Sequence, residues 1–245
     1  FQARRQLISD SLGTAHVILR SADQRSSNRH EFRPNNYFYY LTGYHARGSY
    51  AILSAEPDQM FTLSIPPQSI RTLIYDGGEI SSQELTAQYK PDRVLDYRGV
   101  RSLIDSIVRS GAPIYMDRSD RTFHEDLLRM AGDGESPHIR HIGQLVDPMR
   151  VIKYAAEVVR IQKACNITAL ALTLVLKSCE PGMYDFQMES LIEGTFLEYG
   201  SAMPGFSSFV GSGPNATILH YEPNTRIMED GDLLLMDIGA EYGYY

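Results

Sequence analysis

The stretch from Met149 to Lys177 contains neither glycine nor proline, and it constrains the fold of this 245-residue chain more than any other feature. Asp147 is a suitable N-cap, Pro148 suits the first helical position, and Glu180-Pro181-Gly182 ends the pattern. We therefore predict a helix of roughly 30 residues, about 45 Å long, with a domain boundary at Val146-Asp147-Pro148. The apolar residues that recur at helical spacing are Val151, Ile152, Ala155, Val158, Val159, Ile161, Leu170 and Leu174.

Helix-like and strand-like segments alternate on the N-terminal side of this boundary. Helical patterns cover residues 1–12, 100–108 and 123–130, and Gly13 and Gly111 stand where the first two end. Strand patterns cover residues 15–19, 37–42, 50–54, 60–65 and 113–116. This alternation predicts that residues 1–146 form an α/β domain.

The chain changes character on the C-terminal side. A second helix is predicted at residues 185–199, closed by Gly200, and strands at residues 206–212, 218–221 and 233–238. Residues 147–245 therefore form a second domain that opens with helices and then begins a sheet. The sheet has only begun where the sequence stops in an aromatic, β-prone stretch, so we expect this second domain to be incomplete.

Charge is distributed unevenly between the two predicted domains. The chain has 23 basic and 30 acidic side chains, a net charge of −7, which argues against a partner recognised through a nucleic-acid backbone. Residues 1–146 carry 17 of each sign, whereas residues 147–245 carry 6 basic and 13 acidic side chains. The excess acid is either a solvated surface or a carboxylate-rich site for hard cations.

The sequence contains no obvious targeting or membrane segment. Its longest apolar runs, such as residues 233–236, are far shorter than the ~20 residues of a membrane helix, so we expect no membrane partner. A cytoplasmic location is the default expectation, although a removed signal peptide stays open because the sequence does not begin with Met. Cys165 and Cys179, ~21 Å apart on one predicted helix, are expected to be buried thiols.

Two residues have side chains suited to chemistry. Asp237 ends an apolar strand that we expect to be buried on both faces, where a carboxylate is costly unless it is paired, hydrogen-bonded or bound to a cation. His220 lies on the short predicted strand 218–221, and histidine carries protons near neutral pH. From position alone, Asp237 could equally cap a loop, and His220 could be an ordinary core residue.

Taken together, these segments resemble the Xaa-Pro aminopeptidase (aminopeptidase P) family, relatives of prolidase, creatinase and methionine aminopeptidase. The resemblance covers nearly the whole chain, with the motifs in the family's order. The residues that carry it are Phe1-Gln2-Ala3-Arg4-Arg5, Phe38-Tyr39-Tyr40-Leu41-Thr42-Gly43, Met149-Arg150-Val151-Ile152-Lys153, Glu157 to Ala164, Gly211-Ser212-Gly213-Pro214-Asn215-Ala216, Ile218-Leu219-His220-Tyr221 and Asp230 to Tyr242.

The resemblance implies a creatinase-type N-terminal α/β domain followed by an incomplete α+β "pita-bread" metallopeptidase domain. It implies an enzyme that hydrolyses the bond between an N-terminal residue and a following proline, and an association into dimers or tetramers. Asp237 would be the first of five ligands to two divalent metal ions, usually manganese in this family. His220 would be the histidine near the scissile bond that positions substrate and moves a proton.

Two departures and several alternatives follow from the same comparison. Phe206 stands where some family members have Tyr, so one hydroxyl contact is absent. The family's second Asp ligand, and its His and two Glu ligands, would fall after Tyr245, so the chain as written is expected to be inactive. The alternatives are a prolidase that cleaves Xaa-Pro dipeptides, a metal-free creatinase-like hydrolase, and a non-catalytic relative that binds peptides or proteins.

Overall fold

The computed structural model describes residues 1–22, 32–66, 70, 73–74, 80–132, 136–222 and 225–245. It divides into two compact units, Phe1–Ile152 and Lys153–Tyr245. The division lies six residues beyond the boundary expected from the sequence at 146/147. Each unit is described by itself below.

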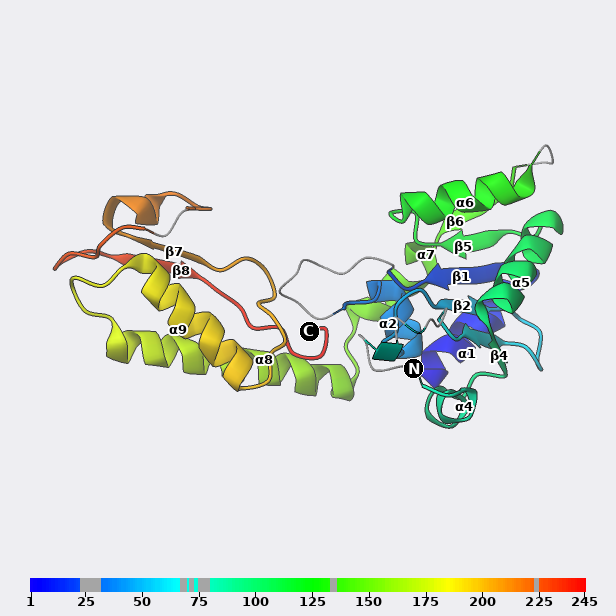
Figure 1. Ribbon diagram of the computed structural model, residues 1–245, viewed down its shortest axis with the longest axis horizontal. Coiled ribbons are helices and arrows are strands. Elements are labelled where there is room, and N and C mark those ends of the chain that lie inside the picture. Colours follow the sequence, from blue (N-terminus) through cyan, green and yellow to red (C-terminus); the bar gives the residue numbers. More distant parts are fainter. Residues whose placement is uncertain (23–31, 67–69, 71–72, 75–79, 133–135, 223–224) are drawn as a thin grey trace. The chain divides into compact units, whose positions relative to one another are not determined.

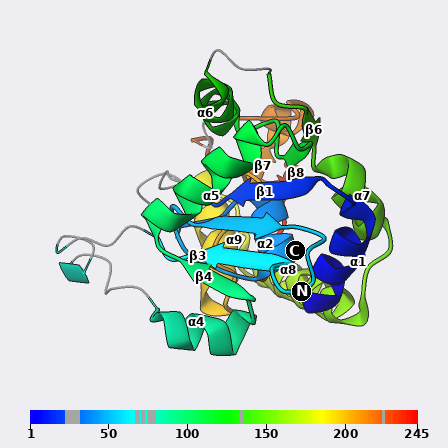
Figure 2. The same cartoon turned by 90° about the vertical axis from the view of Figure 1, so that its right-hand side faces the viewer.

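The first unit is built on a six-stranded mixed sheet in the order β4-β3-β2-β1-β5-β6. The antiparallel pairs are β1–β2 and β2–β3, whereas β1–β5, β5–β6 and β3–β4 are parallel. Figures 1 and 2 show the strands in this order. Their bounds are β1 His16–Arg20, β2 Tyr50–Leu53, β3 Phe61–Ser64, β4 Arg93–Leu95, β5 Ile114–Met116 and β6 Ile139–His141.

Helices cover both faces of this sheet. Along β1, Val17 and Leu19 join one apolar cluster, which includes residues of α1, α2, α4 and α7, while Ile18 joins another, which includes residues of α5 and α6. The alternation follows from the two-residue period of a strand, and the predicted α/β architecture is confirmed. The helices are α1 Gln2–Leu12, α2 Asn36–Thr42, α4 Ser82–Tyr89, α5 Tyr97–Arg109, α6 Arg121–Ala131 and α7 Gly143–Val151.

The aromatic segment 37–42, expected to be a strand, is instead helix α2, so that prediction is wrong. The side chain of Asn35 accepts hydrogen bonds from the amides of Tyr37 and Phe38, which caps the helix N-terminus. Gly43 ends the helix in the left-handed conformation, at φ 69°. Phe38 and Leu41, one turn apart, are buried in the core. Caps at both ends and a buried helical face outweigh the β propensity of the aromatic residues.

The long helix also begins later than expected. Asp147 and Pro148 lie inside α7, whose Val146 is buried in the core of the first unit. The chain is extended at Ile152, and α8 runs from Ala155 to Ser178, with Glu157 accepting a hydrogen bond from the backbone amide of Tyr154 at 2.8 Å. The expected N-cap role of Asp147 is therefore wrong, because the packing of α7 on the first unit separates it from α8.

The second unit packs two helices against a small sheet. Its elements are α8, α9 Asp185–Glu198, β7 Phe209–Ser212, the 3₁₀ helix η1 Gly213–Thr217 and β8 Leu234–Asp237. Strands β7 and β8 are antiparallel. The predicted second helix is confirmed, and so are two of the three strands predicted for this unit. Residues 218–221 do not form a strand. The core contains Ile167, Ala171, Val175, Met188, Ile192, Phe196, Val210, Met228 and Ala240.

One expectation about α8, the burial of its cysteines, is wrong. Cys165 and Cys179 are both exposed rather than buried. Cys165 lies off the buried face of the helix, which contains Ala164, Ile167, Ala171 and Val175, and Cys179 is the C-cap after its last residue. In the described part of the chain, α8 also proves long and apolar enough to cross a membrane by length and composition alone. Helices in protein cores meet the same criteria, so this is weak evidence.

Candidate active site on the outer face of the β7–β8 sheet

Asp237 ends β8 on the face of the sheet that points away from the helices. Alternate residues of this strand differ in burial: Leu234 and Met236 pack against the core, whereas Leu235 and Asp237 are exposed. No group in the described part of the chain forms a hydrogen bond or ion pair with the Asp237 carboxylate. The carboxylate is therefore available to an external ligand.

The strand that carries Asp237 is not buried on both faces, contrary to the expectation from its sequence. Leu233, which precedes the strand, is 80% exposed, and Leu235 is 36% exposed. The helices α8 and α9 cover one side of the sheet only, so the outer side keeps its apolar residues in contact with solvent. The sequence pattern shows that these residues are apolar, but it does not show what covers them.

His220 lies in a turn after η1, not on a strand, and its side chain is exposed. Its imidazole stacks on the Phe209 ring, with 4.6 Å between the ring centroids and 12° between the ring planes. Phe209 is the cross-strand partner of Asp237. Directly opposite residues of an antiparallel pair project to the same face. The structure thus brings His220 and Asp237 to one face of the sheet, with Phe209 linking them.

Gly211 allows the chain to fold back across this face. A Cβ atom at Gly211 would lie 3.1 Å from the Asn215 carbonyl oxygen and 3.5 Å from Cδ1 of Tyr221. The first atom belongs to the backbone and has little room to move. The missing side chain therefore lets η1 and the turn after it pass close to β7, which carries His220 to Phe209.

A polar cluster holds the start of η1 on its other side. Arg226 forms an ion pair with Asp232 and donates a hydrogen bond to Ser212 Oγ at 2.9 Å. The hydrogen bond from Arg226 to Asp232 raises the pKa of the arginine and lowers that of the aspartate. Gly213, at φ +53°, fits against the pair, because a Cβ there would lie 2.6 Å from Asp232 Oδ1. The Gly211-Ser212-Gly213 motif thus spans a strand end and a turn.

Phe206, the position where some relatives have Tyr, lies close to the end of β8. A Cβ atom at Gly239 would be 2.9 Å from Cε1 of Phe206, and the Gly205 amide donates a hydrogen bond to the Gly239 carbonyl at 2.8 Å. The ring therefore lies against the segment that follows Asp237. It contributes apolar surface there and no hydroxyl group.

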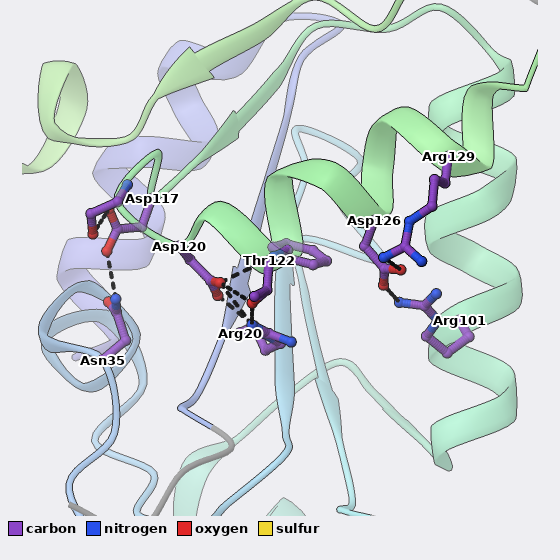
Figure 3. A network of polar contacts seen from close by, with 10 residues as sticks. Arg20, Asn35, Arg101, Asp117, Asp120, Thr122, Asp126 and Arg129 are labelled. Atoms are coloured by element: carbon purple, nitrogen blue, oxygen red, sulfur yellow. Dashed lines mark hydrogen bonds and ion pairs between the residues drawn. The ribbon is translucent and has the colours of Figure 1, made fainter.

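A second group of polar side chains, in the first unit, serves the fold instead. Figure 3 shows Asp120, the N-cap of α6, with Arg20 and Thr122, and Asp126 of α6 between Arg101 and Arg129. The Arg20 guanidinium binds Asp120 through two hydrogen bonds, of 2.7 and 3.0 Å. These oppositely charged side chains neutralise one another, so we assign them a role in stabilising the fold.

Asp117 occupies the same region and is buried. Asn35 Nδ2 donates to it at 2.5 Å, and Ser119 donates through its amide at 2.9 Å and its hydroxyl at 2.7 Å. Burial opposes ionisation, but the donors from Ser119 and Asn35 and the nearby His141 outweigh it, so the Asp117 pKa lies below its ordinary value. The carboxylate ties the end of β5 to the start of α2.

The described residues contain no group of three or more His, Cys, Asp or Glu side chains that could hold a metal ion. Asp237 nevertheless suits the role of one ligand, because it is an exposed carboxylate with no competing partner in the part of the chain that the structure describes. Divalent cations favour such oxygen ligands. Any metal centre at this face therefore needs ligands besides those described here.

Comparisons with known proteins bear on both units. Residues 1–115 match the aminopeptidase P N-terminal domain, and residues 159–245 match metallopeptidase family M24. The chain belongs to the Xaa-Pro aminopeptidase family. The M24 domain matched here is present in part, as the sequence predicts.

Individual relatives agree with this assignment. The Xaa-Pro aminopeptidase of Escherichia coli K12 is 26% identical over 262 residues, which cover all of this chain and 59% of the relative. Proline aminopeptidase P II from Yersinia pestis has a TM-score of 0.85 at 26% identity, over 99% of this chain and 59% of that chain. Zinc-substituted E. coli aminopeptidase P in complex with product has a TM-score of 0.86 at 25% identity, over the same shares. The chain thus spans 59% of the length of each of these three relatives.

Sequence reasoning did not identify Phe209 or Gly211 as members of this site. Gly211 belongs to a motif that is visible in the sequence, and its flanking Asn215 signals a close turn. Phe209 has no such signal, because its importance depends on the β7–β8 register and on where the turn after η1 places His220.

Proposed function

We propose that the protein to which this chain belongs is a metal-dependent exopeptidase that releases the N-terminal residue from peptides with proline in second position. One observation carries the proposal: Asp237, an exposed carboxylate without a partner among the described residues, and the imidazole of His220 share one face of a sheet in an M24 domain. Family membership supplies the reaction class, and the side chains supply groups that suit it.

Asp237 would bind the metal ions, and His220 would hold or move a proton at the substrate. A neutral imidazole can donate a hydrogen bond to the substrate carbonyl, and its protonated form can pass a proton to the departing proline nitrogen. When bound, the divalent metal ions supply Lewis-acid polarisation of the scissile carbonyl and lower the pKa of water. Manganese is the proposed metal, and the zinc-substituted E. coli relative supports only the presence of a divalent site there.

The 245-residue chain alone is proposed to be inactive, because its described residues supply Asp237 but no group of three ligands. The proposed activity, its peptide substrate and an assembly into dimers or tetramers therefore concern a longer protein that adds the remaining ligands. A cytoplasmic location is proposed for it as well.

The test compares this chain with the longest polypeptide that contains it, after the intact mass of each has been measured. Both are assayed on an Xaa-Pro-Xaa tripeptide and on an Xaa-Pro dipeptide, before and after exhaustive chelation and after return of Mn²⁺. We expect the longer protein to cleave the tripeptide, to lose activity on chelation and to regain it with manganese. Activity that survives full chelation would refute the metal mechanism.

The same assay separates the alternatives. Cleavage of the dipeptide alone indicates a prolidase. Tight binding of the tripeptide without cleavage, at full metal occupancy, indicates a peptide-binding relative. Either result replaces the proposed aminopeptidase activity while leaving the family assignment in place.

A further inference from the structure

We propose that Phe209 is a positioning residue for His220: its ring sets the plane of the imidazole at the face that carries Asp237. This inference rests on the proposed function for its catalytic consequence. The stacking geometry on which it is based stands independently, because it follows from the β7–β8 register and the ring contact alone.

The orientation of the His220 ring is the first step of the argument. Both ring nitrogens bind hydrogen-bond partners and protons in the plane of the imidazole, so the tilt of that plane decides which groups they reach. In most histidine sites a hydrogen bond to one nitrogen sets this orientation. No hydrogen bond to the His220 ring is formed within the described part of the chain.

The stack on Phe209 takes the place of that hydrogen bond. The two rings lie 12° from parallel with their centroids 4.6 Å apart, so the imidazole lies flat over the phenyl face. Its two nitrogens therefore lie in a plane nearly parallel to the phenyl ring. An aliphatic side chain at position 209 would offer apolar contact but no flat face, and the imidazole could tilt.

The second step of the argument concerns the position of the Phe209 ring, which is the platform on which His220 stacks. Phe209 is paired with Asp237, so the platform shares its face of the sheet with the Asp237 carboxylate. Gly211, on the same face of β7, leaves room for the backbone that delivers His220. Phe209 thus couples the position of the imidazole to the strand pair that carries Asp237, although no direct contact between His220 and Asp237 is needed.

The first experiment measures the stack without using activity. The 245-residue chain is labelled at histidine, the ring carbon-bound protons of His220 are assigned with His220→Gln, and their shifts are read at one fixed pH. The phenyl face should move these resonances upfield. Phe209→Leu should remove that shift and Phe209→Tyr should keep it.

A matched control separates this effect from the loss of any aromatic ring. Phe186 is a half-exposed phenylalanine of α9 that stacks on Tyr184, with 5.0 Å between the ring centroids. Phe186→Leu should leave the His220 resonances unchanged. If Phe209→Leu fails to fold, as judged by its amide spectrum, Phe209→Met provides the same removal of the flat face with a more adaptable side chain.

The second experiment measures kcat and KM in the longer, manganese-loaded protein. Phe209→Leu should lower kcat by roughly three- to tenfold, the range expected for loss of one aromatic stack, with KM nearly unchanged. Phe209→Tyr should restore kcat, and Phe186→Leu should match the unmodified protein. The conservative rescue distinguishes ring orientation from a general weakening of the fold.

The outcomes distinguish this inference from the proposed function. The positioning role is overturned if Phe209→Leu leaves the His220 resonances unchanged. It is also overturned if the upfield shift is lost but kcat stays the same. In both cases the peptidase activity stands. An unmodified longer protein without any Xaa-Pro cleavage overturns the proposed function, and the catalytic consequence of the stack with it.

Discussion

Phe209 and Asp237 lie directly opposite each other in the β7–β8 pair, so the ring that carries His220 and the exposed carboxylate project to the same face of the sheet. Neither His220 nor Asp237 has a hydrogen-bonded partner among the described residues. Their placement on one face of the sheet therefore depends on the strand register and on a ring stack. Changes that disturb the register or the turn after η1 should affect the site without touching either functional group.

Replacing Gly211 with alanine should destabilise the second unit by about 1–3 kcal/mol. The added Cβ would press on the Asn215 carbonyl oxygen, 3.1 Å away, and displace η1. Equilibrium urea unfolding followed by circular dichroism measures the loss. Gly194→Ala is the matched control, because Gly194 lies within α9 with nothing near its Cβ position, and alanine there should stabilise the helix by about 0.5–1 kcal/mol. Equal effects of the two substitutions would contradict the close approach at Gly211.

Replacing Asp237 with asparagine should reduce the manganese bound to the longer protein and abolish its peptidase activity, because a neutral amide is a weaker ligand than a carboxylate. Elemental analysis of the protein after gel filtration measures the metal content. Asp230→Asn alters an exposed aspartate in the turn before β8 and should leave both quantities unchanged. Full metal content in Asp237→Asn would exclude Asp237 as a ligand.

Removing the Asn35 side chain should destabilise the first unit by about 1–2 kcal/mol. The amide oxygen caps α2 through the amides of Tyr37 and Phe38, and the amide nitrogen donates to buried Asp117. Urea unfolding of Asn35→Ala tests this, with exposed Asn36→Ala as the control. If the two variants unfold at the same urea concentration, the cap does not contribute as described.

The stability of the first unit should fall as the pH drops below about 4. The Asp117 pKa is lower in the folded state than its ordinary value of 3.8, so the unfolded chain binds more protons in this range. Stability from Asp117 is then fully present above the unfolded pKa and is lost as the pH falls through the folded pKa. Asp117→Asn should remove this part of the dependence, so its stability difference from the unmodified protein should shrink at low pH. A difference that is constant from pH 6 to pH 3 would contradict the assignment.

Local signals predicted most elements of both units. Glycines at helix ends, apolar residues at helical spacing and the turn at residues 56–59 located α1, α5, β2 and β3 because each signal acts within a few residues. The strand predicted at residues 37–42 was wrong because it rested on the β propensity of the aromatic residues. The helix caps on either side, Asn35 and Gly43, are local signals too, and they favour the helix. The predicted start of α8 was wrong for a different reason. Helical spacing does not show that α7 packs on the core of the first unit and ends before α8 begins.

The chemical character of the site was also present in the sequence, but its arrangement was not. The sequence by itself determined that a carboxylate at position 237 ends an apolar strand and that a histidine follows a glycine-rich turn, because residue type and spacing are enough for this. Only the tertiary structure decided that β7 pairs with β8 in the register that opposes Phe209 to Asp237, that Gly211 leaves room for η1, and that His220 lies flat on Phe209. The physical reason is that strand register and ring stacking depend on packing between distant segments, and a one-residue slip would move Phe209 to the other face.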